Sequence, residues 1–167
     1  DGVELAQYLS ECAQSAKIDA YEEEIGSHIA EAAQKRVKLG SQALFADVQA
    51  AMENSSDVLI YIHGFNVSWH EAVGAALAMQ LMLQNTPGRA ADQDIRVILF
   101  TWPSDGMALP WVSYKSDRSE ATGSGAAVGR ALLKTRDYLA ALRDRAQKGG
   151  KKLCGQDIHL LCHSMGN

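Results

Sequence analysis

The sequence predicts an α/β fold, in which a parallel sheet has helices on both faces and a helical N-terminal segment precedes it. Three runs of β-branched, aromatic and other apolar residues, at positions 58–62, 96–102 and 158–162, are typical of strands buried on both faces. Helical patterns separate the runs. The order strand, helix, strand, helix, strand predicts parallel strands joined by right-handed crossovers.

Composition and charge exclude several classes of protein. The chain has 167 residues, 47% of them hydrophobic and 22% charged, the balance of a water-soluble domain with its own core. Sixteen basic residues stand against 20 acidic ones, a net charge of -4, so no nucleic-acid or anionic-lipid partner is expected. The apolar runs are too short for a membrane span.

The cysteines do not form a recognisable framework. The chain has an odd number of cysteines: Cys12, Cys154 and Cys162. They have no CxxC spacing, and no histidines are paired at metal-ligand offsets. This pattern argues against disulfides and against a zinc site, and predicts small buried hydrophobic residues. We expect no metal and no cofactor, and reduced cysteines favour the cytoplasm.

Residues 1–56 predict a helical segment, followed by an α/β core over residues 57–167. Alanine-rich stretches at 3–16 and 20–37 suit helices, and Ser41 is a candidate N-cap for a third helix to about residue 54. One face of that third helix is apolar, at offsets of three and four: Leu44, Phe45, Val48 and Met52. This face is expected to pack beside the sheet.

Start and stop signals bound the helices between the strands. Ser68 and Glu71 have the spacing of a capping box before the first helix, which residues 85–88 end with Pro and Gly. A second helix is expected from about Gly125 to the Gly-Gly pair at 149–150. Residues 103–124 then form a long connection, where we expect the active face.

The last predicted strand leads into Cys162-His163-Ser164-Met165-Gly166. This matches the nucleophile elbow G-x-S-x-G, except that Cys162 replaces the first glycine. An elbow is a very tight turn from strand to helix that lifts the serine hydroxyl above the sheet, and small flanking residues allow it. The alternative is a solvated serine in a turn after a strand.

A second motif, His63-Gly64-Phe65-Asn66, ends the first strand. Acyl transfer needs donors aimed at the oxygen that becomes negative, and the N–H groups of Phe65 and Met165 are the candidates for this oxyanion hole. Gly64 permits the backbone geometry. We expect His63 to fix this loop by hydrogen bonds rather than to act as a base.

The third motif closes the second strand. Trp102 could wall an acyl or alcohol pocket, or it could be a core aromatic. Ser104 and Asp105 are expected to form a turn.

Taken together, VLIYIHGFN, ILFTWPSDG, the spacing of Tyr114 and Asp117, and HLLCHSMGN resemble the α/β-hydrolase superfamily. More specifically, they resemble the bacterial "alpha/beta hydrolase of unknown function" family, whose members look like esterases or lipases. The resemblance covers residues 58–167. The resemblance implies Ser164 as nucleophile and Phe65 and Met165 as oxyanion hole. We expect the substrate-binding residues to be His63, Gly64 and Trp102.

The family's order of serine, acid and histidine implies that the rest of the triad follows Ser164. The chain is therefore expected to be the N-terminal part of an ester hydrolase, nearly inactive alone and completed by later sequence or a companion chain. The alternatives are a non-catalytic binding module and an acyltransferase. The acyl group, the alcohol, the acceptor and the oligomeric state are left open.

Overall fold

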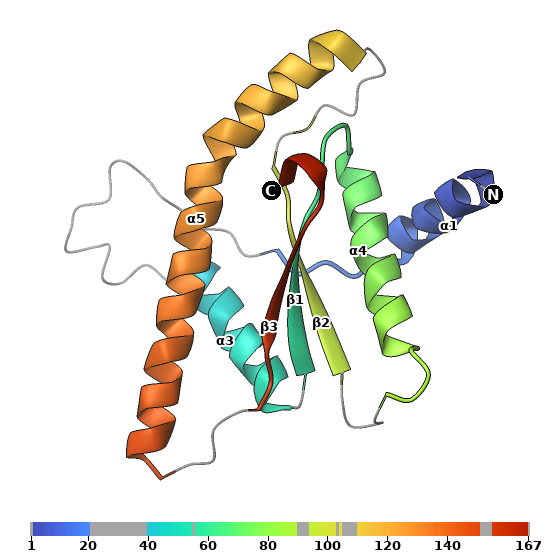
Figure 1. Cartoon of the computed structure of the whole chain (residues 1–167). Helices are drawn as coiled ribbons and strands as arrows, with labels where there is room; N and C mark the ends of the chain where they lie inside the picture. Colours follow the sequence, from blue (N-terminus) through green and yellow to red (C-terminus); the bar gives the residue numbers. More distant parts are fainter. Residues whose placement is uncertain are drawn as a thin grey trace.

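Three parallel strands form the centre of the fold (Figure 1). The structure is a computed structural model that describes residues 2–20, 40–54, 56–89, 94–102, 104, 110–150 and 155–166. Its elements follow in chain order: α1 (Gly2–Ser15), α3 (Gly40–Glu53), β1 (Ser56–Ile62), α4 (Trp69–Gln84), β2 (Asp94–Phe100), α5 (Pro110–Lys148), β3 (Ile158–Cys162) and the 3-10 turn η1 (Ser164–Gly166). The helix expected at 20–37 lies outside the described residues, apart from Ala20.

The strands are ordered β2-β1-β3, and Val58 of β1 pairs with Arg96 on one side and Ile158 on the other. The predicted α/β class and the three predicted strands are confirmed. Burial on both faces holds for β1, whose side chains are nearly all buried. The same expectation is wrong for β2 and β3, whose residues are only partly buried or exposed. Leu160 of β3 is 50% exposed, and β3 has a neighbour on one side only among the described residues.

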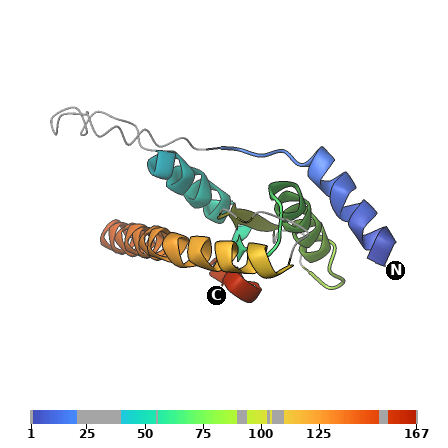
Figure 2. The same ribbon diagram turned by 90° about the horizontal axis from the view of Figure 1, so that it is seen from above.

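Helices cover both faces of the sheet, as Figure 2 shows from above. α4 lies on one face with α1 packed outside it, while α3 and α5 lie on the other. Gly74 of α4 makes the α1 contact close, since a Cβ there would collide with the Leu9 carbonyl oxygen. The chain therefore crosses from β1 to β2 over one face and from β2 to β3 over the other.

The main core lies between the sheet and the helices α3 and α5. The predicted apolar face of α3 packs there, with Val48 and Met52 buried against alternate residues of β1. The buried members of this cluster are Val48, Met52, Val58, Ile60, Ile62 and Trp102. Since Ile62 ends β1 and Trp102 follows β2, the core reaches the edge of the sheet where the strands end.

The start of α4 is fixed by the predicted capping box. The Ser68 hydroxyl accepts from the Glu71 N–H at 3.3 Å, and the Glu71 carboxylate accepts from the Ser68 N–H at 2.8 Å. Hydrogen bonds from the Ser68 hydroxyl and N–H lower the pKa of Glu71 below its ordinary value. The loop between β1 and α4 is thus held at its helical end.

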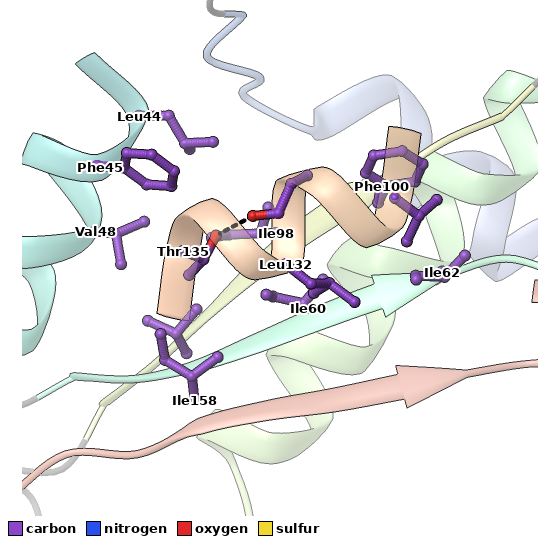
Figure 3. Close-up of a pocket in the computed structure, with 13 residues that line it drawn as sticks. Leu44, Phe45, Val48, Ile60, Ile62, Ile98, Phe100, Leu132, Thr135 and Ile158 are labelled. Atoms are coloured by element: carbon purple, nitrogen blue, oxygen red, sulfur yellow. Dashed lines mark hydrogen bonds between the residues drawn. The ribbon is translucent and has the colours of Figure 1, made fainter. Parts of the chain in front are cut away.

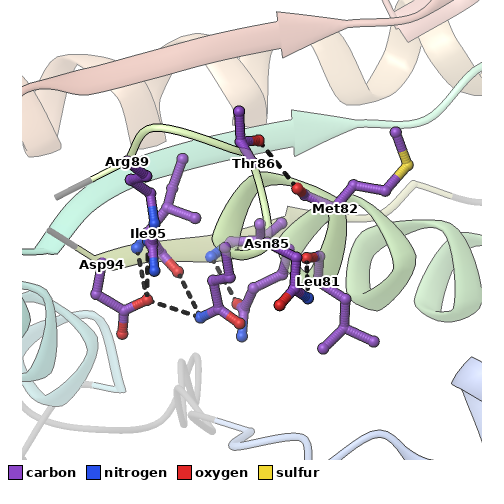
Figure 4. Close-up of polar contacts among 10 residues, drawn as sticks. Leu81, Met82, Asn85, Thr86, Arg89, Asp94 and Ile95 are labelled. Atoms are coloured by element: carbon purple, nitrogen blue, oxygen red, sulfur yellow. Dashed lines mark hydrogen bonds and ion pairs between the residues drawn. The ribbon is translucent and has the colours of Figure 1, made fainter. Parts of the chain in front are cut away.

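Polar contacts tie the other end of α4 to the start of β2 (Figure 4). The Gln84 amide donates to the Asp94 carboxylate at 2.7 Å, and the Ile95 N–H donates to the same oxygen at 2.8 Å. Partial burial works to raise the pKa of Asp94, but these bonds and the nearby Arg89 hold it below its ordinary value. The contacts fix where β2 begins.

α5 is longer than predicted. It begins at Pro110 rather than near Gly125, so the expectation of a connection through 103–124 is wrong for residues 110–124, which are helical. Proline suits the first turn of a helix, where its missing N–H has no partner to lose. Interior glycines cost only about 1 kcal/mol each, and Ala121 and Val128 pack against the core on either side of Gly123 and Gly125.

An apolar cavity of about 70 Å³ lies between α3, α5 and the sheet (Figure 3). The Thr135 hydroxyl donates to the Ala131 carbonyl at 2.9 Å, so the polar group on this wall is satisfied within α5. Cavities with such lining stay dry. None of the described helices, α5 included, combines the length and the apolar character needed to cross a membrane.

Candidate active site

Ser164 occupies a sharp turn directly after β3. Its φ of 53° lies in the left-handed region, which is unusual for a residue other than glycine. The His163 N–H donates to the Ile62 carbonyl at 3.0 Å and extends the β1–β3 ladder by one residue, and the Gly166 N–H closes the turn on the His163 carbonyl at 2.9 Å. The chain therefore changes from strand to helical turn at Ser164, whose side chain is exposed.

Gly166 leaves no room for a side chain. A Cβ at this position would lie 2.7 Å from the His63 carbonyl oxygen and 2.8 Å from the Ile62 carbonyl oxygen. Real Cβ atoms do not approach backbone oxygens this closely, so the turn can pack against the end of β1 only with glycine here. This is the physical requirement for a small residue two positions after the serine.

Gly64 makes the matching contact from the other side. A Cβ on Gly64 would lie 2.8 Å from His163 Nδ1, 2.9 Å from the His163 carbonyl oxygen and 2.9 Å from Ser164 Cβ. The loop after β1 is thus in direct backbone contact with the turn after β3. Phe65 and Met165 are the residues that follow the two sides of this contact.

His63 is almost completely buried, at 1% exposure, and its ring is fully engaged in hydrogen bonds. Nδ1 lies 3.1 Å from the Gly64 carbonyl oxygen, which can only accept, so Nδ1 carries the hydrogen. The Trp102 N–H donates to Nε2 at 3.3 Å, and the Thr101 hydroxyl lies 2.9 Å from the same nitrogen. Nε2 therefore holds the lone pair, and its partners occupy it.

Trp102 covers the His63 ring. The two rings stack with centroids 5.3 Å apart and planes 8° from parallel, and the indole N–H donates to the His63 carbonyl at 2.9 Å. Trp102 is 5% exposed and belongs to the core cluster. A further bond, from the Val67 N–H to the Ser104 hydroxyl at 3.2 Å, joins the same two loops. The ends of β1 and β2 are thus tied together.

The predicted site residues come together at one edge of the sheet. His63 and Trp102 form the buried part of this edge, and Gly64 lies between them and Ser164. Phe65 follows Gly64 and Met165 follows Ser164, so their backbone amides adjoin the contact between these two residues. This is where the carboxyl ends of β1 and β3 meet, at the top of Figure 1. In open α/β sheets, ligands bind outside the carboxyl ends where the strand order reverses, and β2-β1-β3 reverses between β1 and β3.

The remaining histidines do not share this interior. His163 is exposed on the turn itself. His70 lies on α4, 3.4 Å from the Ser10 hydroxyl, and His159 pairs with Asp57 at 3.8 Å on neighbouring strands. His28 lies outside the described residues. In the part of the chain that the structure describes, no three His, Cys, Asp or Glu side chains gather as metal ligands.

Two residues beside the candidate site, Thr101 and Asn66, were not predicted from the sequence. Thr101 reaches His63 across 38 positions of sequence, and no local signal pairs these residues. Asn66 adopts a φ of 56°, the second left-handed residue in this region. Asparagine tolerates this conformation well, so the Gly64-Phe65-Asn66 stretch could have suggested a tight turn.

Comparison with known proteins finds one match. The family described as "Alpha/beta hydrolase of unknown function (DUF900)" matches residues 41–167. No curated protein and no solved structure matches the chain. The match runs from the start of α3 through the turn at Ser164 and includes the three strands, the two crossovers and the contact between Gly64 and Ser164. The chain belongs to this family of α/β hydrolases.

Proposed function

We propose that Ser164 is the nucleophile of a serine hydrolase that acts on carboxylic esters through an acyl-enzyme. The observation that carries this proposal is the left-handed turn at Ser164, held against the glycine loop that follows β1. A strained strand-to-helix turn with an exposed hydroxyl is the geometry that α/β hydrolases use for their nucleophile. Strain at such a position is kept where function requires it.

In the proposed reaction, the Ser164 hydroxyl attacks the ester carbonyl and its proton passes to a base. The tetrahedral oxyanion accepts hydrogen bonds from the N–H groups of Phe65 and Met165, which lie beside the Gly64–Ser164 contact. Collapse breaks the ester C–O bond, the protonated base gives its proton to the leaving alcohol, and the acyl group stays on Ser164. Water, deprotonated by the same base, then attacks this ester, and the carboxylic acid leaves as the serine takes back its proton.

His63 is not the base in this scheme. Its Nε2 lone pair already accepts from Trp102 and Thr101, and the ring is buried. In the proposed scheme the acid and the histidine of the triad follow Ser164 in sequence beyond residue 167, in keeping with the order of triad residues in α/β hydrolases. His63, Gly64 and Trp102 would then shape the site from beneath rather than transfer protons.

A fluorophosphonate probe tests the nucleophile. The protein is expressed with any sequence that its gene encodes beyond Asn167, labelled, and digested for mass spectrometry. We expect the label on Ser164, and Ser164→Ala should lose both the label and the hydrolysis of p-nitrophenyl esters. Ser119→Ala, which changes an exposed serine on α5, is the matched control and should label normally.

Absence of label on Ser164 in the folded protein would refute the nucleophile and favour the binding module. Labelling followed by transfer to an added alcohol, faster than hydrolysis, would instead identify an acyltransferase. Circular dichroism of Ser164→Ala should match the wild type, since Ser164 is exposed and alanine keeps its Cβ.

A further inference from the structure

The His63 ring is hydrogen-bonded to the peptide group that carries the Phe65 N–H. Nδ1 donates to the carbonyl oxygen of Gly64, and this carbonyl shares its peptide plane with the N–H of Phe65. In a trans peptide the C=O and the N–H point in opposite directions. The described residues contain no cis peptide. Holding the Gly64 carbonyl toward the ring therefore turns the Phe65 N–H away from it.

The ring itself lies on the β2 side of this loop. Its Nε2 is held by Thr101 and Trp102, both directly after β2, and the Trp102 ring covers its face. β3 and the turn at Ser164 lie on the other side of β1. The direction opposite to the ring is thus the direction of Ser164, against which Gly64 is already packed.

We infer that His63 is a positioning residue that sets the direction of the Phe65 N–H, through the hydrogen on Nδ1. Two observations support this together: the full burial of the ring and the acceptor role imposed on Nε2 by a backbone N–H. With Nε2 committed, the hydrogen must sit on Nδ1, and the Gly64 carbonyl is the group it meets. The importance of this direction for catalysis rests on the proposed function.

Two variants test the roles of the two His63 ring nitrogens separately. His63→Asn can place its amide nitrogen near the position of Nδ1 and keep a donor for the Gly64 carbonyl. His63→Gln can place its amide near Nε2 and keep an acceptor for the Trp102 N–H, but it loses the donor. Both lose the ring stacking, so similar melting temperatures are expected.

The direct readout is nuclear magnetic resonance, which needs no turnover. Nitrogen-15 shifts of the wild-type ring should show hydrogen on Nδ1 and a lone pair on Nε2. The Phe65 amide signal should stay near its wild-type position in His63→Asn and move in His63→Gln. Hydrogen on Nε2 in the wild type, or equal movement of the Phe65 signal in both variants, would overturn the inference.

The kinetic readout follows from the same pair. A misdirected oxyanion donor should lower kcat in His63→Gln by about 10-fold to 100-fold, below the full loss of a donor, with little change in KM. His63→Asn should retain most of kcat. Equal losses in the two variants would indicate a merely structural role.

The two proposals fail in different ways. If the wild type is not labelled by fluorophosphonate, the proposed function falls while the resonance result still decides the role of His63. If Ser164 is labelled but the Phe65 signal does not distinguish the variants, the nucleophile stands and the positioning role is refuted.

Discussion

Two regions of this molecule are packed in opposite ways. At the carboxyl edge of the sheet, Gly64 and Gly166 lie so close to their neighbours that a methyl group has no room, and the buried His63 has a partner at each ring nitrogen. Beneath α5, apolar side chains surround a cavity of about 70 Å³, and Gly129 faces open space. A methyl group added in the first region should therefore do harm, while one added in the second should be tolerated.

The largest expected effect is that of Gly64→Ala. Its Cβ would press on the His163 carbonyl and Ser164 Cβ, so the turn must move. Overpacking of this kind costs about 1–3 kcal/mol. We expect urea denaturation to show that loss and fluorophosphonate labelling of Ser164 to disappear.

Gly129→Ala is the matched control, because nothing lies within 4 Å of a Cβ there. Alanine should stabilise α5 by about 0.5–1 kcal/mol and leave labelling unchanged. Equal stability of Gly64→Ala and the wild type would break the contrast between the two regions.

Trp102→Phe should have the next largest effect on the free energy of unfolding. It keeps an aromatic ring over His63 but removes the indole N–H, and the buried His63 carbonyl loses its donor. Leaving a buried acceptor unsatisfied costs about 1–3 kcal/mol. Trp69→Phe, at a position that is 55% exposed, should change the free energy of unfolding by less than about 0.5 kcal/mol. Similar losses in both variants would contradict the role given to the indole.

Glu71→Gln sharpens the comparison at the loop that carries Phe65, the proposed oxyanion donor. The folded protein lowers the pKa of Glu71 below its ordinary 4.5. The ionised Glu71 carboxylate therefore adds to the free energy of unfolding above pH 4.5, and this addition is lost as the pH falls through the lowered pKa. Glutamine keeps the capping box but not the charge-assisted bonds. We expect a difference of about 0.5 kcal/mol at pH 7, limited by solvent screening.

Denaturation series at several pH values measure this difference. It should shrink toward zero below pH 4.5. A constant difference between the wild type and Glu71→Gln across that range would show that the carboxylate charge makes no contribution.

The smallest effect is expected for Thr135→Val on the cavity wall. The hydroxyl is bonded to the Ala131 carbonyl of its own helix, so replacing it with a methyl group adds apolar contact and costs one weak bond. Stability should change by less than about 0.5 kcal/mol, toward a gain. Thermal unfolding tests it, and a loss comparable to that of Gly64→Ala would show that this face is packed as tightly as the edge.

Some of the fold was predictable because its signals are local. The capping box at Ser68 and Glu71 was predicted and is present, and the three apolar runs became strands. The start of α5 was missed because serines and glycines before residue 125 lower helix propensity, whereas contacts of Ala121 and Val128 with the core stabilise the helix there. Propensity is a local quantity, and tertiary packing overrode it.

The sequence by itself determined the alternation of strands and helices, the small residue two positions after Ser164, and the glycine after His63. Only the tertiary structure decided that Gly64 packs against the turn at Ser164 and that Gly166 packs against the end of β1. The same holds for the contact of His63 with Thr101, 38 positions away. Strand order is the physical reason. Periodicity and caps are encoded within a few residues. Which loops meet depends instead on β1 lying between β2 and β3, an arrangement that buries the apolar side chains of β1.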